Sequence, residues 1–184
     1  LLIGLAGSSM AFAQYAQSIT EVIGGGGRAV TDLVCPEGSV YSQTPDGVNG
    51  RSYVSGYYYC DNVLTEPAAP VGNITWWMLE MSPDANLAFD IFIHEDNAGQ
   101  PGAVIESFFD VDYTVVNTGE TFYGYQVFEY SFTLPTPLAI AAGTWIGIRD
   151  LPDIDYNHHH YWLTSSDGDN KIWLTQGYPL QGEG

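Results

Sequence analysis

Residues 74–102, ITWWMLEMSPDANLAFDIFIHEDNAGQPG, decide the fold of this chain. In the second half of this stretch, every other side chain is apolar, which is the period of a strand with one buried face: Leu87, Phe89, Ile91 and Ile93. An apolar segment with two tryptophans, 74–81, precedes it. A turn-rich bridge, 82–86, separates the two, and a polar Gly/Pro loop, 95–102, follows. The stretch therefore predicts the central strand pair of a β-sandwich.

The rest of the chain contains further short strand-like segments with turn signals between them. They are residues 29–34, 52–60, 103–116, 122–134, 144–149, 161–164 and 172–175. No helical periodicity appears after the first 13 residues. Short strands separated by turns at about ten-residue intervals predict an all-β chain, a two-sheet antiparallel β-sandwich of jelly-roll type.

Three segments carry more specific expectations. Turn signals at Pro45-Asp46-Gly47 and Asn49-Gly50 predict a loop over residues 36–51. Pro135 and Pro137 are predicted to end the strand 122–134. That strand has apolar bulk on both faces, so we expect it to be covered on both sides or to lie at a subunit contact. Its predicted faces are Phe122, Phe128, Tyr130, Phe132 and Leu134 on one side, and Tyr123, Tyr125 and Val127 on the other.

The first residues look like an export signal. Residues 1–13, LLIGLAGSSMAFA, are apolar and then small, with Ala11 and Ala13 spaced as in a secretory cleavage site. The run is too short and too rich in Gly and Ser for a membrane-spanning helix. We therefore expect a secreted or cell-surface protein with no membrane span in the mature chain and a single β-sandwich domain over residues 28–184.

Residues 14–27 form a predicted extended arm and hinge. The arm is β-prone, with Tyr15, Ile19, Val22 and Ile23 as its apolar positions, and the hinge is Gly24, Gly25, Gly26 and Gly27. Such an arm has two fates. It folds back as an edge strand of its own domain, or it adds to the sheet of a neighbouring subunit and builds a filament.

The chain is strongly acidic, with 22 acidic and 4 basic residues and a formal net charge of −18. This charge repels nucleic acid and suits divalent cations. Alternating oxygen ligands predict a calcium site, completed by a second acidic turn: Asp150, Asp153, Asp155, Asn157, Asp167 and Asp169. The match to a calcium loop is partial, because His158 and Thr164 stand where an EF-hand has Gly and Glu. The alternative is two solvated acidic turns, and for His158, His159 and His160 a surface trio rather than a zinc site.

Two cysteines and a set of aromatic residues suggest further sites. Cys35 and Cys60 are predicted to form a disulfide worth about 3 kcal/mol in an oxidising compartment, with a buried reduced pair as the alternative. Tyr58, Trp162 and Trp173 could form a flat platform for sugar rings, or they could belong to the core and a subunit interface. The chain carries no Gly-x-Ser-x-Gly elbow, no HExxH motif and no phosphate-binding loop, so we expect no catalytic activity.

About residues 55–176 resemble a family of secreted bacterial β-sandwich domains, jelly-roll-like in type. Members often occur in exported proteins with C-terminal sorting or anchoring tails. The matching features are Trp76-Trp77, Asp96-Asn97-Ala98-Gly99 with Pro101-Gly102, Glu129-Tyr130, Ala141-Ala142-Gly143-Thr144-Trp145 and Tyr161-Trp162. The resemblance implies extracellular display without known catalytic residues. No sorting tail follows, which favours release or self-assembly over anchoring.

These observations together favour an extracellular, non-catalytic structural protein. We expect a subunit of a filament, tube or surface coat that self-assembles by adding its N-terminal strand to a neighbour and is strengthened by calcium. The alternative is a secreted module that binds polysaccharide or acts in adhesion.

Overall fold

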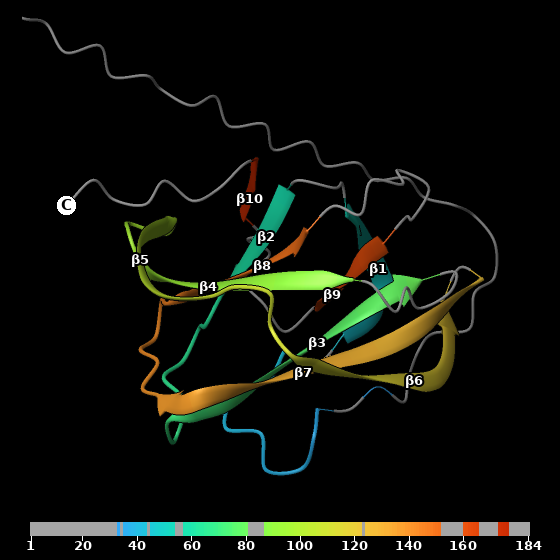
Figure 1. Ribbon diagram of the computed structural model, residues 1–184, viewed down its shortest axis with the longest axis horizontal. Coiled ribbons are helices and arrows are strands. Elements are labelled where there is room, and N and C mark those ends of the chain that lie inside the picture. The colour runs from blue at the N-terminus through green and yellow to red at the C-terminus, as the bar shows by residue number, and fades with distance from the viewer. Residues whose placement is uncertain are drawn as a thin grey trace, which may run out of the picture.

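The residues that the structure describes form ten β-strands in two antiparallel five-stranded sheets (Figure 1). The computed structural model describes residues 33, 35–43, 45–53, 57–80, 87–122, 124–151, 160–165 and 173–176, and none of them is helical. No helix in those ranges has the length and apolar character needed to cross a membrane. The strands are β1 (Pro45–Tyr53), β2 (Tyr57–Asn62), β3 (Val71–Glu80), β4 (Ala88–Asp96), β5 (Pro101–Phe108), β6 (Tyr113–Phe122), β7 (Tyr125–Leu138), β8 (Trp145–Leu151), β9 (His160–Ser165) and β10 (Trp173–Gln176).

The strands pair in a nested order. Sheet A has the order β1-β9-β3-β7-β6, and sheet B has the order β10-β2-β8-β4-β5. Within them, β4 pairs with β5, β3 with β7, β2 with β8 and β1 with β9. This is the pairing of one long hairpin that is folded across both sheets. Its successive strand pairs, from β4-β5 to β1-β9, lie alternately in sheet B and sheet A. Strands β6 and β10 extend sheet A and sheet B at one edge each.

The two strands predicted as a central pair do not pair with each other. Strand β3 lies in sheet A beside β7, and β4 lies in sheet B beside β8. They face each other across the core, where the rings of Trp76 and Phe89 meet edge to face at 5.3 Å. The prediction of adjacency was wrong because alternation identifies the buried face of a strand but carries no information about its neighbour.

The core between the sheets is built from the residues that alternate along β3, β4 and β7. Phe89, Ile91 and Ile93 are completely buried. Facing them are side chains from β3 and β7: Trp76, Met78, Phe128, Tyr130, Phe132 and Leu134. Stacking of Trp76 on Tyr130, with centroids 5.6 Å apart, continues the aromatic packing into sheet A.

Both faces of β7 are covered near its start, as predicted from its apolar bulk, whereas Thr133 and Pro135 farther along the second face are exposed. Val127 is fully buried in a second cluster with Leu33, Trp77, Leu79, Phe122 and Leu163. Phe122 lies in this second cluster and not on the Phe128 face as predicted. The reason is that β6 ends at Phe122 and the chain turns at Gly124, with a φ of 84°, before β7 begins.

Two predicted boundaries were wrong. Strand β7 passes through Pro135 and Pro137, because the pairing with β3 shifts register between Val71 and Asn73 and the prolines lie in this irregular part. The segment predicted as a loop over 36–51 contains most of β1, whose pairing with β9 shifts between Pro45 and Gly50. In both places a bulge accommodates residues that usually interrupt a ladder.

The face of sheet B opposite the core carries buried polar groups. Asp90 accepts hydrogen bonds from Arg149 Nη2 and from the backbone N–H of Asp110, the latter at 2.8 Å. The Arg149 guanidinium lies over the ring of Phe92, 5.3 Å from its centroid. Four residues after Asp90 in β4, His94 is 2% exposed, and its Nδ1 donates to the carbonyl oxygen of Gly102 at 3.0 Å.

The burial of His94 predicts an acid-sensitive stability. Burial lowers its pKa below the ordinary value of 6.5, an effect that the hydrogen bond to Gly102 only partly offsets. The unfolded chain therefore binds a proton that the folded chain excludes, so the free energy of unfolding falls as the pH falls through about 6.5. The slope from this residue is at most about 1.4 kcal/mol per pH unit.

Urea unfolding between pH 7.5 and 5.5 measures this dependence, with His94→Gln as the comparison. We expect a flatter profile for the variant, because contributions common to both proteins cancel in the difference. Parallel profiles would show that His94 does not carry the effect.

Candidate functional site

Sheet A is split beside the first part of β3. On one side β3 pairs with β7 along its length. On the other side, within the described residues, it pairs with β9 only through Met78 and Leu79. Among the described residues, 71–77 therefore have no strand partner on that side, in the interior of the sheet order and not at its rim.

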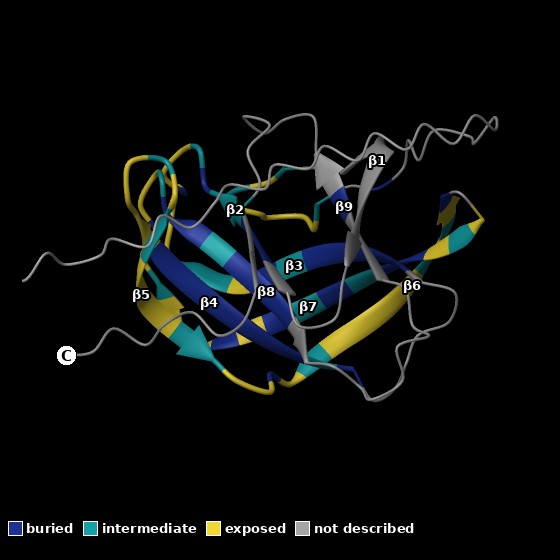
Figure 2. Cartoon of the chain, turned by 90° about the horizontal axis from the view of Figure 1, so that it is seen from above, coloured by how far each residue is buried: buried dark blue, intermediate teal, exposed yellow. Residues whose placement is uncertain are grey.

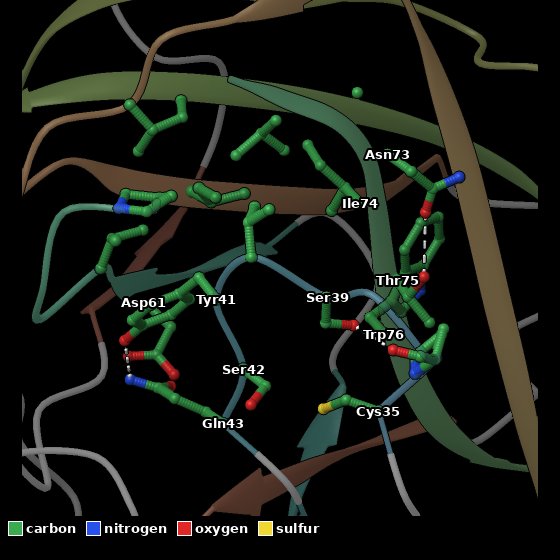
Figure 3. A pocket seen from close by; sticks show the side chains of 18 of the residues that line it. Cys35, Ser39, Tyr41, Ser42, Gln43, Asp61, Asn73, Ile74, Thr75 and Trp76 are labelled. Atoms are coloured by element: carbon green, nitrogen blue, oxygen red, sulfur yellow. Dashed lines mark hydrogen bonds between the residues drawn. The ribbon is translucent and has the colours of Figure 1, made fainter. Parts of the chain in front are cut away.

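A cavity of about 500 Å³ lies at this open edge (Figure 3). Its apolar lining comes from both sheets: Val63, Val71, Ile74, Trp76, Trp77, Ile140, Ile146, Ile148 and Leu163. Residues 35–43 border it on the side away from β7. We call this cavity and the open edge of residues 71–77 the β3 notch. The notch is a gap in sheet A, and Ile146 and Ile148 of sheet B also line it.

Side-chain hydrogen bonds hold the bordering segment in place. The Tyr41 hydroxyl accepts from Gln43 Nε2 at 2.8 Å and from the Leu64 N–H at 2.9 Å (Figure 3). Gln43 Nε2 also donates to the carbonyl oxygen of Asn62 at 3.3 Å. Nearby, the Ser39 hydroxyl donates to the Pro36 carbonyl within a turn. These contacts tie the segment to the end of β2, but they do not form a β-ladder with β3.

Two buried donors in the lining lack acceptors. The indole Nε1 atoms of Trp76 and Trp77 are buried and have no hydrogen-bond partner among the described residues. Both rings line the β3 notch, and both residues are less than one-tenth exposed. A buried unsatisfied donor costs about 1–3 kcal/mol. Two residues that line the notch therefore carry buried donors without an acceptor among the described residues.

No protein-family model, curated protein or solved structure matches the chain. Its function is therefore inferred from the geometry of the described residues.

The structure does not form the predicted disulfide between Cys35 and Cys60. Cys35 is half-buried and packs beside the cluster of Leu33 and Trp77, at the border of the β3 notch. Cys60 is fully buried with Phe92 and Trp145 on the other face of sheet B. The two sulfur atoms thus belong to different clusters. Burial, with the charge of Asp61, raises the pKa of the Cys60 thiol well above its usual value, so this thiol stays protonated.

The predicted calcium site is largely outside the described residues. Asp150 lies in β8, where its backbone pairs with Phe89. Asp153, Asp155, Asn157, Asp167 and Asp169 fall outside the described ranges. Within those ranges no group of three or more His, Cys, Asp or Glu side chains is placed to hold a metal. The calcium site stays a prediction.

The predicted sugar platform is divided between the two sheets. Trp162 lies in β9 of sheet A, opposite Met78 of β3. Tyr58 and Trp173 lie in β2 and β10 of sheet B. Trp173 is partly buried against the cluster of Cys60, Phe92 and Trp145. Only Tyr58 and Trp173 share a sheet, so the structure does not bring the three together on one face.

The predicted export segment, arm and hinge fall outside the described residues; they comprise residues 1–13, the arm positions Tyr15, Ile19, Val22 and Ile23, and Gly24 to Gly27. Sequence reasoning missed the β3 notch itself. Trp76-Trp77 was the available signal, and it was interpreted only as part of an apolar strand segment. That interpretation is correct for both rings, but it does not reveal that their nitrogen atoms lack acceptors.

Proposed function

We propose that this chain is an extracellular, non-catalytic structural protein that assembles into a filament, tube or coat. The N-terminal arm of one subunit inserts as a strand into the β3 notch of the next. The open edge of residues 71–77 beside an apolar cavity is the observation that supports this proposal. The nested strand pairing supports a jelly-roll topology for the subunit, because a rolled-up hairpin produces that order.

Strand insertion would satisfy three features of the notch at once. Main-chain groups of the arm would pair with the open edge of β3. Ile19 and Ile23, which share one face of the arm with Glu21 between them, would pack toward Ile146 and Ile148. Acceptor groups of the arm could reach the indole N–H groups that lack partners. Seven strand residues span about 23 Å, and the arm of residues 14–23 is long enough to supply them.

The donor and the acceptor are different surfaces of the same chain. Such a heterologous contact does not close on itself unless the rotation between subunits happens to form a ring, so it builds a linear polymer. Insertion would also require residues 35–43 to give way beside β3. Side-chain hydrogen bonds hold this segment, and a strand ladder would replace them.

Replacing Ile19 and Ile23 together by Asp in the full chain tests the arm. We expect polymers of the unmodified protein in negative-stain images and sedimentation, and no polymers of the variant, since two carboxylates cannot enter an apolar cavity without a large desolvation cost. Thr20→Asp/Val22→Asp is the control on the opposite face of the arm, and we expect it to disturb assembly less. Polymers of undiminished length from Ile19→Asp/Ile23→Asp would refute the proposal.

Cys35 provides a direct probe of the notch in the same variant. Adding a synthetic peptide of residues 14–27 is expected to slow alkylation of Cys35, which borders the cavity. Cys60 is the internal control, because its buried, protonated thiol should not react in the folded protein with or without the peptide. Unchanged Cys35 alkylation at saturating peptide would place the arm elsewhere.

A further inference from the structure

The exposed apolar side chains of this protein gather on one side of the sandwich. Among the described residues, six large hydrophobic side chains are exposed, and five of them come from residues 104–116: Val104, Ile105, Phe109, Val115 and Val116. They follow β5, the link after it and β6, which form a largely exposed band along one flank (Figure 2). A chain with a net charge of −18 has ample polar residues to cover such a flank, so the concentration indicates a contact surface.

This flank is a firm part of the fold. Strand β5 is the edge of sheet B and β6 is the edge of sheet A, and the short link between them crosses from one sheet to the other. The ring of Phe108 packs on Phe132 at 5.2 Å, and the Tyr113 hydroxyl donates to the Leu87 carbonyl at 2.9 Å. The edge is thus held in place on both sides of the link.

Strand β6 is the last of the described strands of sheet A, and the first part of its outer edge is uncharged. Residues 113–117 pair regularly with β7, and the register shifts only between Asn117 and Thr121. Residues 113–119, YTVVNTG, contain no charge, and no Lys or Pro interrupts β6. Charged side chains, Lys and Pro are the features by which edge strands usually avoid pairing with another chain. The nearby negative charges lie outside this segment: Glu106 is in β5, and Asp110 and Asp112 are in the link between β5 and β6.

We propose that two copies of this chain associate through β6, pairing antiparallel about Val115. Val115 is the middle of the regular segment 113–117, and it is 43% exposed. This centre pairs Thr114 with Val116 of the second copy, and the ladder of residues 113–117 contains no carboxylate. Asp110 and Glu120 come opposite each other only beyond that ladder. An uncharged edge offers no opposite charges to a charged partner. It is also the place where two chains of net charge −18 repel each other least, so a second copy of this chain is the partner that fits.

The contact would join the two copies of sheet A into one continuous sheet of ten strands. A ladder of five residues is a small interface, so a single pair is expected to dissociate readily. Along a polymer the same contact repeats at every subunit, and the repeats act together. The contact is independent of the arm, and it would appear as paired filaments when the arm assembles and as dimers when it does not.

The test combines Val115→Glu with the arm variant Ile19→Asp/Ile23→Asp in the full chain. We expect paired filaments from the unmodified protein and filaments of half the width from Val115→Glu. We expect dimers from the arm variant and monomers from the combined variant, so the sedimenting mass should fall twofold between these two. Thr136→Glu, at an exposed position of β7, is the charge-matched control and is expected to change neither width nor mass. An arm variant that is monomeric at high concentration, or filaments whose width Val115→Glu leaves unchanged, would overturn the proposal.

A cross-link keeps the proposal testable if Val115→Glu fails to fold. Val115→Cys in a Cys35→Ser background should give a covalent dimer on mild oxidation, because a two-fold axis sets the two introduced sulfur atoms opposite each other. Thr136→Cys in the same background should remain uncross-linked. Equal dimer yields from both positions would overturn pairing about Val115. Polymers that persist in the arm variant would refute strand addition, and the cross-link would still decide the β6 contact.

Discussion

Arg149→Ala is expected to lower the free energy of unfolding by about 3–5 kcal/mol, because it leaves the Asp90 carboxylate buried without its cation. Asp90 is 2% exposed and pairs with Arg149 directly across β4 and β8. The backbone N–H of Asp110 would still donate to the carboxylate, but one neutral donor does not replace a guanidinium. The substitution also removes the cation from the face of the Phe92 ring.

Urea unfolding followed by tryptophan fluorescence measures the loss. The double variant Asp90→Leu/Arg149→Met is the informative control, since replacing both ions by apolar side chains of similar size removes the buried charge altogether. We expect it to recover most of the stability. Glu106→Ala, at an exposed site of β5, should change stability by less than about 0.5 kcal/mol. A loss below about 1 kcal/mol for Arg149→Ala would mean that water reaches Asp90.

Phe89→Ala is expected to cost about 3–5 kcal/mol, because it empties the centre of the core. The Phe89 ring is completely buried and meets the rings of Trp76, Tyr113 and Tyr130 at 5.1–5.3 Å. These partners come from three strands of sheet A, whereas Phe89 belongs to sheet B. The substitution therefore weakens the contact between the layers as well as removing apolar area from the core.

The matched control removes the same ring from a surface position. Phe109 is 53% exposed and contacts Phe92 from the link between β5 and β6. Phe109→Ala should cost less than about 1.5 kcal/mol, because most of the ring is already in water. Similar losses for Phe89→Ala and Phe109→Ala in chemical denaturation would contradict the described core.

The sequence contained enough local information to predict the strand class and the buried faces. Alternation along residues 87–94 correctly identified Phe89, Ile91 and Ile93 as core residues, all of them completely buried. The prediction of a single buried face was wrong, because Asp90, Phe92 and His94 on the other face are each only 2% exposed. The apolar bulk on both faces of β7 correctly predicted cover on both sides at Val127 and Phe128, although Thr133 on the Val127 face is exposed. These features succeed because the two-residue period of a strand is a property of the local backbone.

Predictions that needed long-range information were the ones that failed. Pro45 and Pro135 looked like breaks, but bulges against β9 and β3 absorb them. The expected disulfide needed Cys35 and Cys60 to be close, and the fold places them in separate clusters. A turn signal or a cysteine count reports nothing about which distant segment becomes the neighbour.

Local patterning in this chain determines that strands form and which side chains of β4 face the core, but not that its other face is also buried. It specifies neither the partner of β3 nor the point where β9 leaves it, and the β3 notch exists only because of that separation. The open edge of β6 likewise depends on its position last in sheet A. Both surfaces arise from strand order, and strand order is set by the packing of the two sheets against each other, a cooperative property that no single segment encodes.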